Sequence, residues 1–242
     1  VVSELCEATN CQEAPRESLL GTAKLELALA DFARERKLAA LGVQCWTSMQ
    51  TDYGVSPCTA MGRLTEQGIM TACEVDIHGA LTMLIQHRAA LGETVPHFID
   101  WTIQHQEDPN LVFMWHCGNA PHSLACPGCG VRLREHSILG KSVGVERAIG
   151  TSEFQVKPGT VTVSRLVEYD KVFKLLVTTG EIEPDERQLR GSWSWMRVRD
   201  LAGLYRTLIE EGFIHHASMI HGDFTKPIVD FCRFAGIDVV LV

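Results

Sequence analysis

The sequence has no long hydrophobic run and no cluster of basic residues. No apolar stretch reaches the roughly 18 residues that a transmembrane helix needs, and the N-terminus lacks the charged-then-apolar pattern of a signal peptide. With 22 lysines and arginines against 30 aspartates and glutamates, the formal net charge is −8. A net negative charge disfavours binding to nucleic acid or to anionic membranes. We therefore expect a cytoplasmic protein that binds neither nucleic acid nor a membrane.

The sequence also lacks the even cysteine count of a disulfide framework. It has nine cysteines, and most of them stand inside apolar segments. In a cytosolic protein this placement favours buried thiols over disulfides. CPGC at 126–129 has the CxxC spacing of a zinc or redox motif, but the sequence contains no second CxxC. Cys117, His122 or His136 would have to complete a zinc site, so we expect a β-turn with reduced thiols there.

Residues 1–92 alternate predicted helices and strands. Residues 1–16 are polar and show no periodicity, which indicates a surface segment. Apolar spacing and glycine or proline punctuation then predict helices over 18–37, 56–68 and 78–91 and buried strands over 38–46 and 69–75. Helices that alternate with strands are typical of a mostly parallel α/β layer. Glu74 would stand at the carboxyl end of a strand, where such sheets bind their ligands.

After residue 93 the pattern changes to short β-rich runs separated by Asp-Pro, Pro-Gly and Gly. Such runs predict an antiparallel sheet or a small barrel. A last α/β unit follows, with helices over 198–212 and 225–235 and strands over 213–222 and 237–242. The expected fold class is α/β, with a partial parallel α/β layer over 1–92 and an antiparallel β-rich, barrel-like domain over 93–242.

Four ionisable residues, Glu74, Asp100, His116 and His216, stand in apolar or glycine-marked surroundings. Burying such groups costs free energy unless they are paired, hydrogen-bonded or bound to a metal. Two carboxylates with one or two imidazoles are a common ligand set for a divalent metal that keeps a position open for substrate oxygens. An enzyme is therefore the leading hypothesis.

Seven stretches occur in an informative order along the chain. They are QCW (44–46), PCTAMGRLTEQG (57–68), CEVDIHGALTM (73–83), FIDW (98–101), HCGNAP (116–121), FQVKPGTVTVSRL (154–166) and GFIHHASMIHGD (212–223). As an ordered set they resemble the carboxyl-terminal half of the L-fucose and L-arabinose isomerase family of aldose–ketose isomerases. In that family a glutamate at the end of a strand, a later carboxylate and a histidine near the C-terminus hold a divalent metal, usually manganese. The matching positions are Glu74, Asp100 and His216, which implies Mn²⁺ or Mg²⁺ as the cofactor.

Two positions point to different branches of that family. Arabinose isomerases are similar to this chain in placing a metal-binding histidine shortly after the second carboxylate, so the resemblance implies His116 as a fourth ligand. The alternative for His116 is a hydrogen-bonded strand histidine. An aspartate rather than a glutamate at position 100 favours the fucose isomerases. The sugar therefore stays open between the two types.

The chemistry of such isomerases explains these residue types. A proton moves between C1 and C2 of the sugar through an ene-diolate, which requires a carboxylate near the carbon acid and stabilisation of a developing oxyanion. The resemblance assigns Glu74 and Asp100 both metal binding and proton transfer. Asp76 and His78 are expected to be a helix N-cap and a partner that supports a ligand. The expected substrate contacts are Gln44, Trp46, Asn119 and Trp195. For the tryptophans, whose rings can stack on sugar C–H bonds, core packing is the alternative.

The extent of the chain bears on its function. Family members carry an additional amino-terminal α/β region, and the chain begins at Val1 without a methionine, so we expect a processed or truncated product. The alternative function is a non-catalytic sugar-binding or assembly fragment, and a zinc module at CPGC is a third option. The strands over 38–46 and 69–75 would form only part of a sheet with an open edge, which favours pairing with another subunit. We expect a homo-oligomer with contacts near residues 1–70.

Overall fold

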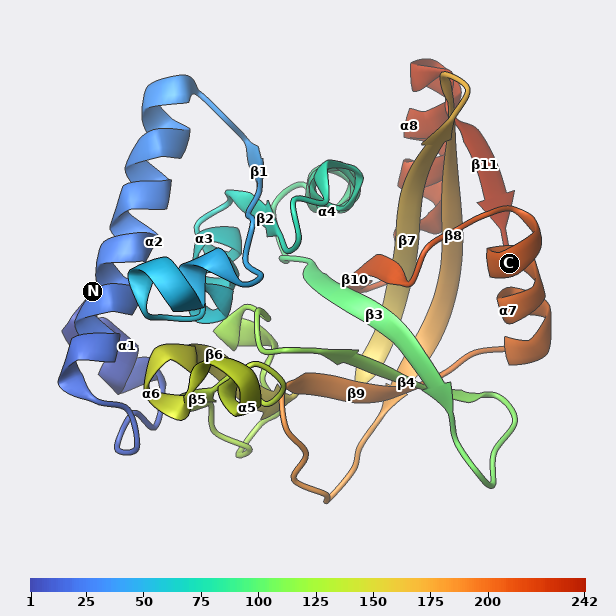
Figure 1. Ribbon diagram of the computed structural model, residues 1–242. Coiled ribbons are helices and arrows are strands. Elements are labelled where there is room, and N and C mark those ends of the chain that lie inside the picture. The colour runs from blue at the N-terminus through green and yellow to red at the C-terminus, as the bar shows by residue number, and fades with distance from the viewer.

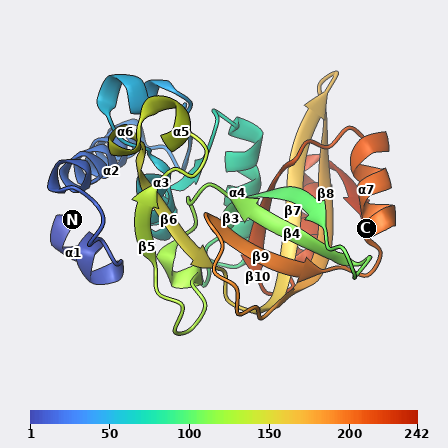
Figure 2. The ribbon, with the colours of Figure 1, turned by 60° about the horizontal axis from the view of Figure 1, so that its bottom comes forward.

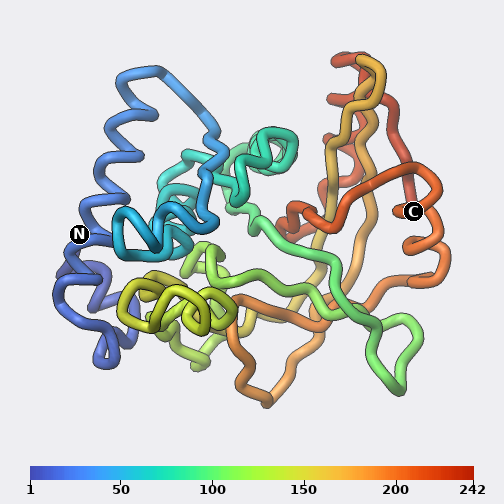
Figure 3. The backbone as a smooth tube through the Cα atoms, in the orientation of Figure 1, coloured from blue at the N-terminus to red at the C-terminus, as the bar shows by residue number.

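Two sheets organise the computed structural model, which describes residues 1–242 (Figure 1). The smaller sheet pairs β1 (Ala40–Gly42) with β2 (Met70–Ala72) in parallel. In spatial order the larger sheet contains β11 (Asp238–Leu241), β8 (Val172–Glu183), β7 (Gly159–Tyr169), β10 (His216–His221), β3 (His97–Gln104), β4 (Leu111–His116), β9 (Ser192–Arg197), β6 (Ile149–Gln155) and β5 (Arg132–Glu135). The two chain ends lie on opposite sides of the molecule (Figure 3). None of the helices combines the length and the apolarity that crossing a lipid bilayer requires.

Helices surround the small parallel sheet. They are α1 (Val2–Ala8), α2 (Arg16–Arg36), α3 (Cys58–Glu66) and α4 (Ile77–Ala89), with a π-helical turn at Met49–Tyr53. Ala33 of α2, Met61 of α3 and Met83 of α4 share one buried core with both strands. The predicted parallel α/β layer is therefore confirmed, although its two strands pair over only three residues each.

The prediction of a featureless surface segment over 1–16 is wrong at α1. Leu5 is completely buried and packs with Leu19 of α2 and Leu133 of β5. A helix of seven residues is too short to show a clear periodic pattern or to be stable alone. Its order comes from packing on elements that are distant in the sequence.

Six antiparallel strands of the large sheet close into a barrel. Neighbours pair in the order β8, β7, β10, β3, β4 and β9, and a further pairing of β9 with the end of β8 closes the ring. The barrel strands lie beside the N-terminal helices, and α4 is at the junction (Figure 2). From α4, the Gln86 side chain donates hydrogen bonds to the carbonyls of Thr162 and Ser218 at 3.2 and 2.9 Å. The predicted barrel-like part is confirmed, and the division of the chain at residue 92 stays a prediction.

The remaining helical segments come after β4 in the chain. They are a 3₁₀ turn at His122–Leu124, α5 (Gly140–Val143), α6 (Val145–Ala148), α7 (Leu201–Glu210) and α8 (Thr225–Ala235). Helix α7 packs on the barrel core through Leu201, Leu204 and Leu208, which stand at helical spacing. Helix α8 and the terminal strand β11 lie where the sequence predicts them.

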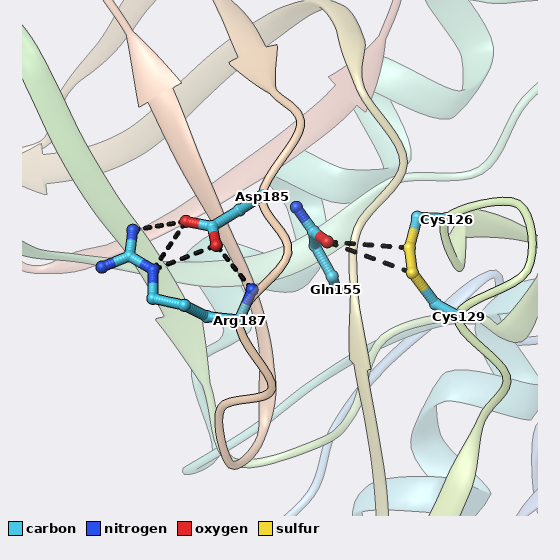
Figure 4. The surroundings of a disulfide bond; sticks show 5 residues. All are labelled: Cys126, Cys129, Gln155, Asp185 and Arg187. Atoms are coloured by element: carbon cyan, nitrogen blue, oxygen red, sulfur yellow. Dashed lines mark hydrogen bonds and ion pairs between the residues drawn. A yellow bond between two sulfur atoms is a disulfide. The ribbon is translucent and has the colours of Figure 1, made fainter.

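The cysteines divide into two groups. Cys45, Cys58, Cys73, Cys117 and Cys232 are free and buried, as predicted. The other four form two disulfides, Cys6–Cys11 and Cys126–Cys129, so the expectation of reduced thiols in CPGC is wrong. Gln155 lies beside the Cys126–Cys129 pair (Figure 4). Cys117, His122 and His136 form no metal-ligating group with this pair, which leaves the zinc option without geometric support.

Candidate active site

Glu74, Asp100 and His216 come together where the small sheet meets the barrel. Asp100 of β3 and His216 of β10 are directly opposite each other in the antiparallel register. The Nε2 atom of His216 lies 3.9 Å from Oδ1 of Asp100 and 3.7 Å from Oε2 of Glu74. Residues that are 142 positions apart along the chain thus share one site. The β3–β10 pairing is what places the aspartate and the histidine there.

The loop from β2 to α4 delivers Glu74. Glu74 and Val75 both have left-handed backbones, with φ of 55° and 58°, which non-glycine residues rarely adopt. A Cβ on Gly42 would lie 3.1 Å from the carbonyl carbon of Val75, so a glycine there lets β1 approach the loop closely. This unusual turn directs the Glu74 side chain, which is 41% exposed, toward His216.

Asp76 fixes the orientation of His216. Its carboxylate caps α4 by accepting a hydrogen bond from the Gly79 amide at 2.8 Å, and it lies 3.0 Å from Nδ1 of His216. The same carboxylate forms a bidentate ion pair with Arg165, which is 3% exposed. Burial acts to raise the pKa of Asp76, but the hydrogen bonds from His216 and Arg165 hold that pKa well below its usual range. Nδ1 of His216 therefore donates to Asp76, and its Nε2 lone pair faces Glu74 and Asp100.

The predicted N-cap at Asp76 is confirmed, but the sequence did not predict that Asp76 also supports His216, and it missed Arg165. His78, the proposed partner, packs its ring against Phe173 at 6.0 Å between centroids. Arg165 stands inside the apolar run of β7. A lone arginine in a buried strand needs a buried anion as its partner. This pattern in the sequence could have identified Arg165.

Asp100 has an unusual electrostatic environment. Burial, countered by His216 and reinforced by Glu74, raises the pKa of Asp100 to about 7. Its Oδ1 atom is buried and has no hydrogen-bond partner. A carboxylate in this condition can gain or lose a proton near neutral pH.

The histidines around this centre differ in position. The exposed His215 forms, with Asp100 and His216, a group whose ligand atoms lie within 4.8 Å of one another. His116 is buried and not part of that group, and its Nδ1 has no partner. The Phe98 ring contacts both imidazoles, at 5.4 Å from His116 and 4.8 Å from His216. A fourth ligand at His116 stays a prediction, and the structure adds His215 as a second candidate.

A cavity of about 630 Å³ opens beside this centre and is lined by Gln44, Cys45, Trp46, Glu74 and Val75. Two of the predicted substrate contacts, Gln44 and Trp46, are thus in its wall. Asn119 is 3% exposed, and neither its amide oxygen nor its amide nitrogen has a hydrogen-bond partner. A second cavity of about 650 Å³ between α4 and α8 is mostly apolar and contains none of the predicted site residues.

The structure does not bring Trp195 to the cavity. Its ring packs against Phe113 and His105, each at 4.9 Å between centroids, and Arg187 lies over it at 5.5 Å. Together with Leu111 and Trp193, Trp195 belongs to a small core cluster on β4 and β9. Trp195 is therefore a core-packing residue, as in the alternative interpretation, because its position on β9 directs its ring to that cluster.

A family model described as the L-fucose isomerase C-terminal domain matches residues 114–242. The chain belongs to this L-fucose isomerase family. The matched part runs from β4 to the C-terminus and so includes Arg165 and His216.

Three relatives are all described as sulfoquinovose isomerase. The protein of Alkalicoccus urumqiensis is 32% identical over 220 residues, which are 90% of this chain and 47% of the relative. The protein of Priestia aryabhattai is 29% identical over 92% of this chain and 48% of its own length, and that of a Clostridium species is 27% identical over 92% and 51%. The L-fucose isomerase-type chain thus spans about half the length of these relatives.

Proposed function

We propose that this chain carries the metal- and proton-transfer centre of an aldose–ketose isomerase that acts on a free sugar through an ene-diolate. The convergence of Glu74, Asp100 and His216 beside the cavity carries the proposal. Membership in the L-fucose isomerase family supports the reaction class. The relatives described as sulfoquinovose isomerase make sulfoquinovose the first substrate to test, beside L-fucose and L-arabinose.

The residues present fit a divalent metal. Two carboxylates face the free Nε2 of one imidazole, and the buried Oδ1 of Asp100 lacks any partner. Hard oxygen ligands with a single imidazole suit Mn²⁺ or Mg²⁺. Glu74, Asp100 and His216 would hold the ion, with His215 or His116 as a further ligand. When bound, it would supply a positive charge that stabilises the oxyanion developing on the sugar.

The protein's own groups divide the remaining work. Asp76 and Arg165 keep His216 in one tautomer and one orientation. Glu74 and Asp100 are the candidates for moving the proton between C1 and C2, since a carboxylate close to the carbon acid is required. In the metal-free chain, a pKa of about 7 lets Asp100 take up or release a proton near neutral pH. Gln44 and Trp46 would orient the sugar from the cavity wall.

The test is to incubate the chain with Mn²⁺ and a panel of aldoses that contains sulfoquinovose, L-fucose and L-arabinose, and to measure ketose formation. We expect conversion of at least one sugar, loss of conversion on chelation, and loss in Glu74→Gln. Mn²⁺ and sugar binding would be measured in parallel. Sugar binding without any conversion would instead support the second candidate, a non-catalytic sugar-binding or assembly fragment, which the half-length match to the relatives favours.

A further inference from the structure

Four of the five free cysteines share the core cluster next to the candidate active site: Cys45, Cys58, Cys73 and Cys117. Two of them are in direct contact, because the sulfurs of Cys45 and Cys73 lie 2.8 Å apart. A disulfide bond requires about 2.05 Å between the sulfurs. A movement of less than about 1 Å would therefore bring this pair to bonding distance.

The backbone holds these two cysteines side by side. Cys45 follows β1 and Cys73 follows β2 directly. Val43 follows β1 directly; its amide donates to the Ala72 carbonyl at 2.9 Å, and its carbonyl accepts from the Val75 amide at 3.2 Å. Two adjacent segments of one sheet thus present their thiols to each other.

Cys45 also lines the 630 Å³ cavity, although only 1% of its surface is exposed. Cys58 and Cys117 are also buried but do not line it, and Cys232 stands on α8 in a separate cluster. Of the five free thiols, that of Cys45 is therefore the one beside a cavity that a small oxidant can enter, and its sulfur is in contact with that of Cys73. Geometry alone therefore selects one pair from the five free thiols.

We propose that Cys45 and Cys73 form a reversible disulfide, and that this modification weakens cation binding at Glu74. The oxidant is a peroxide. The Cys45 sulfur attacks one peroxide oxygen, so that an S–O bond forms, the O–O bond breaks, and the leaving hydroxide takes the thiol proton to become water. The Cys73 sulfur then displaces the second oxygen, which leaves as water with the Cys73 proton. Two thiols lose two electrons to one peroxide, and a dithiol reductant restores them.

Glu74 transmits the modification to the metal site. It follows Cys73 directly, and its carboxylate lies within 4.8 Å of both sulfurs. Because Glu74 and Val75 both have left-handed backbones, the turn has few alternative conformations with which to absorb a displacement of Cys73. A ligand set works only when it is held to about 0.5 Å of its productive geometry. Drawing the two sulfurs together would therefore move Glu74 away from His216 and Asp100.

The first experiment identifies the pair without any metal. The full chain is treated with a stoichiometric amount of hydrogen peroxide, its free thiols are alkylated under denaturing conditions, and disulfides are then reduced and labelled with a heavy alkylating agent. We expect the heavy label on Cys45 and Cys73, beside the existing pairs Cys6–Cys11 and Cys126–Cys129, and the light label on Cys58, Cys117 and Cys232. A light label on Cys45 and Cys73, or a link to Cys117 in their place, would overturn the proposal.

Variants provide the matched controls. In Cys45→Ala the heavy label on Cys73 should disappear, and in Cys232→Ala the labelling of Cys45 and Cys73 should not change. Cys232 is also completely buried, so this control removes a thiol of equal burial. The linked peptide of the wild-type chain, detected by its mass before reduction, decides the question even if a variant does not fold.

The second experiment rests on the proposed function. Mn²⁺ binding to the reduced and the oxidised chain is measured by the electron paramagnetic resonance signal of the free ion. We expect affinity to be about tenfold lower after oxidation and to recover with dithiothreitol. Equal Mn²⁺ affinities of the reduced and the oxidised chain would overturn the effect of the disulfide on Glu74, but not the disulfide itself. No Mn²⁺ binding in either state would refute the proposed metal site, and the peptide map would still report on the disulfide by itself.

Discussion

Replacing Asp76 by asparagine is the most informative single change. Asparagine has nearly the same shape and is a good N-cap, so α4 should keep its capping hydrogen bond at Gly79. The variant loses the negative charge that pairs with Arg165 and accepts from Nδ1 of His216. It therefore separates the ion pair from the cap and tests what the charge contributes.

The expected magnitudes are large. Arg165 is 3% exposed, and removing one partner of a buried ion pair costs about 3–5 kcal/mol of the free energy of unfolding. The amide oxygen of asparagine still offers an acceptor, so we expect the lower end, about 3 kcal/mol. Loss of a carboxylate that orients a metal-ligating histidine reduces metal affinity about 10- to 100-fold. Mn²⁺ binding should therefore fall by at least about tenfold.

The assay is urea unfolding of the metal-free chain, followed by calorimetric titration with Mn²⁺. Because the pKa of Asp76 is held below its usual range, its stabilising contribution is present above about pH 4 and is lost as the pH falls further. The difference between wild type and variant should shrink accordingly in acid. The control is Asp31→Asn, which breaks an exposed ion pair with Arg34 and should cost less than about 1 kcal/mol. An Asp76→Asn variant as stable as the control, with unchanged Mn²⁺ affinity, would refute this account.

Three further predictions follow from the same structure. Glu74→Gln should abolish isomerisation without unfolding the chain, because the side chain is 41% exposed and keeps its shape; turnover at the wild-type rate would exclude a catalytic carboxylate there. With its pKa raised to about 7, Asp100 should make the free energy of unfolding of the metal-free chain fall by up to about 4 kcal/mol between about pH 4 and 7, and Asp100→Asn should remove that fall in urea titrations at several pH values. Light scattering should show a homo-oligomer, since β1 and β2 each have one strand neighbour and α2 exposes Leu27 and Phe32; a monodisperse monomer at high concentration would contradict it.

The elements of this fold could be predicted where local pattern and tertiary structure agree. The helix predicted over 18–37 is α2, and the helix predicted over 78–91 is α4, because apolar spacing and glycine or proline punctuation are local properties. Helix α1 could not be predicted, since Leu5 is ordered by contacts with α2 and β5. The closure of the barrel was also beyond local pattern, because pairing of β8 with β9 joins segments through their register.

In the candidate site, too, some features could be predicted from the sequence and others depend on the tertiary structure. Unpaired ionisable residues in apolar segments, with an ordered set of motifs, were enough to select Glu74, Asp100 and His216. The sequence could not reveal that Arg165 neutralises Asp76, nor that Trp195 lies in a separate cluster, because both depend on which strand faces which. The contact between Cys45 and Cys73 is likewise a property of two neighbouring loops.

Sequence by itself therefore determined the residue types, the order of the elements and the family resemblance. These depend on the positions of residues along the chain, and folding does not change those positions. Tertiary structure alone decided the tautomer of His216, the raised pKa of Asp100 and the pairing of thiols beside Glu74. Each of these depends on distances of a few ångströms between atoms of different elements, and only the packing of α4 and the small sheet against the barrel sets those distances.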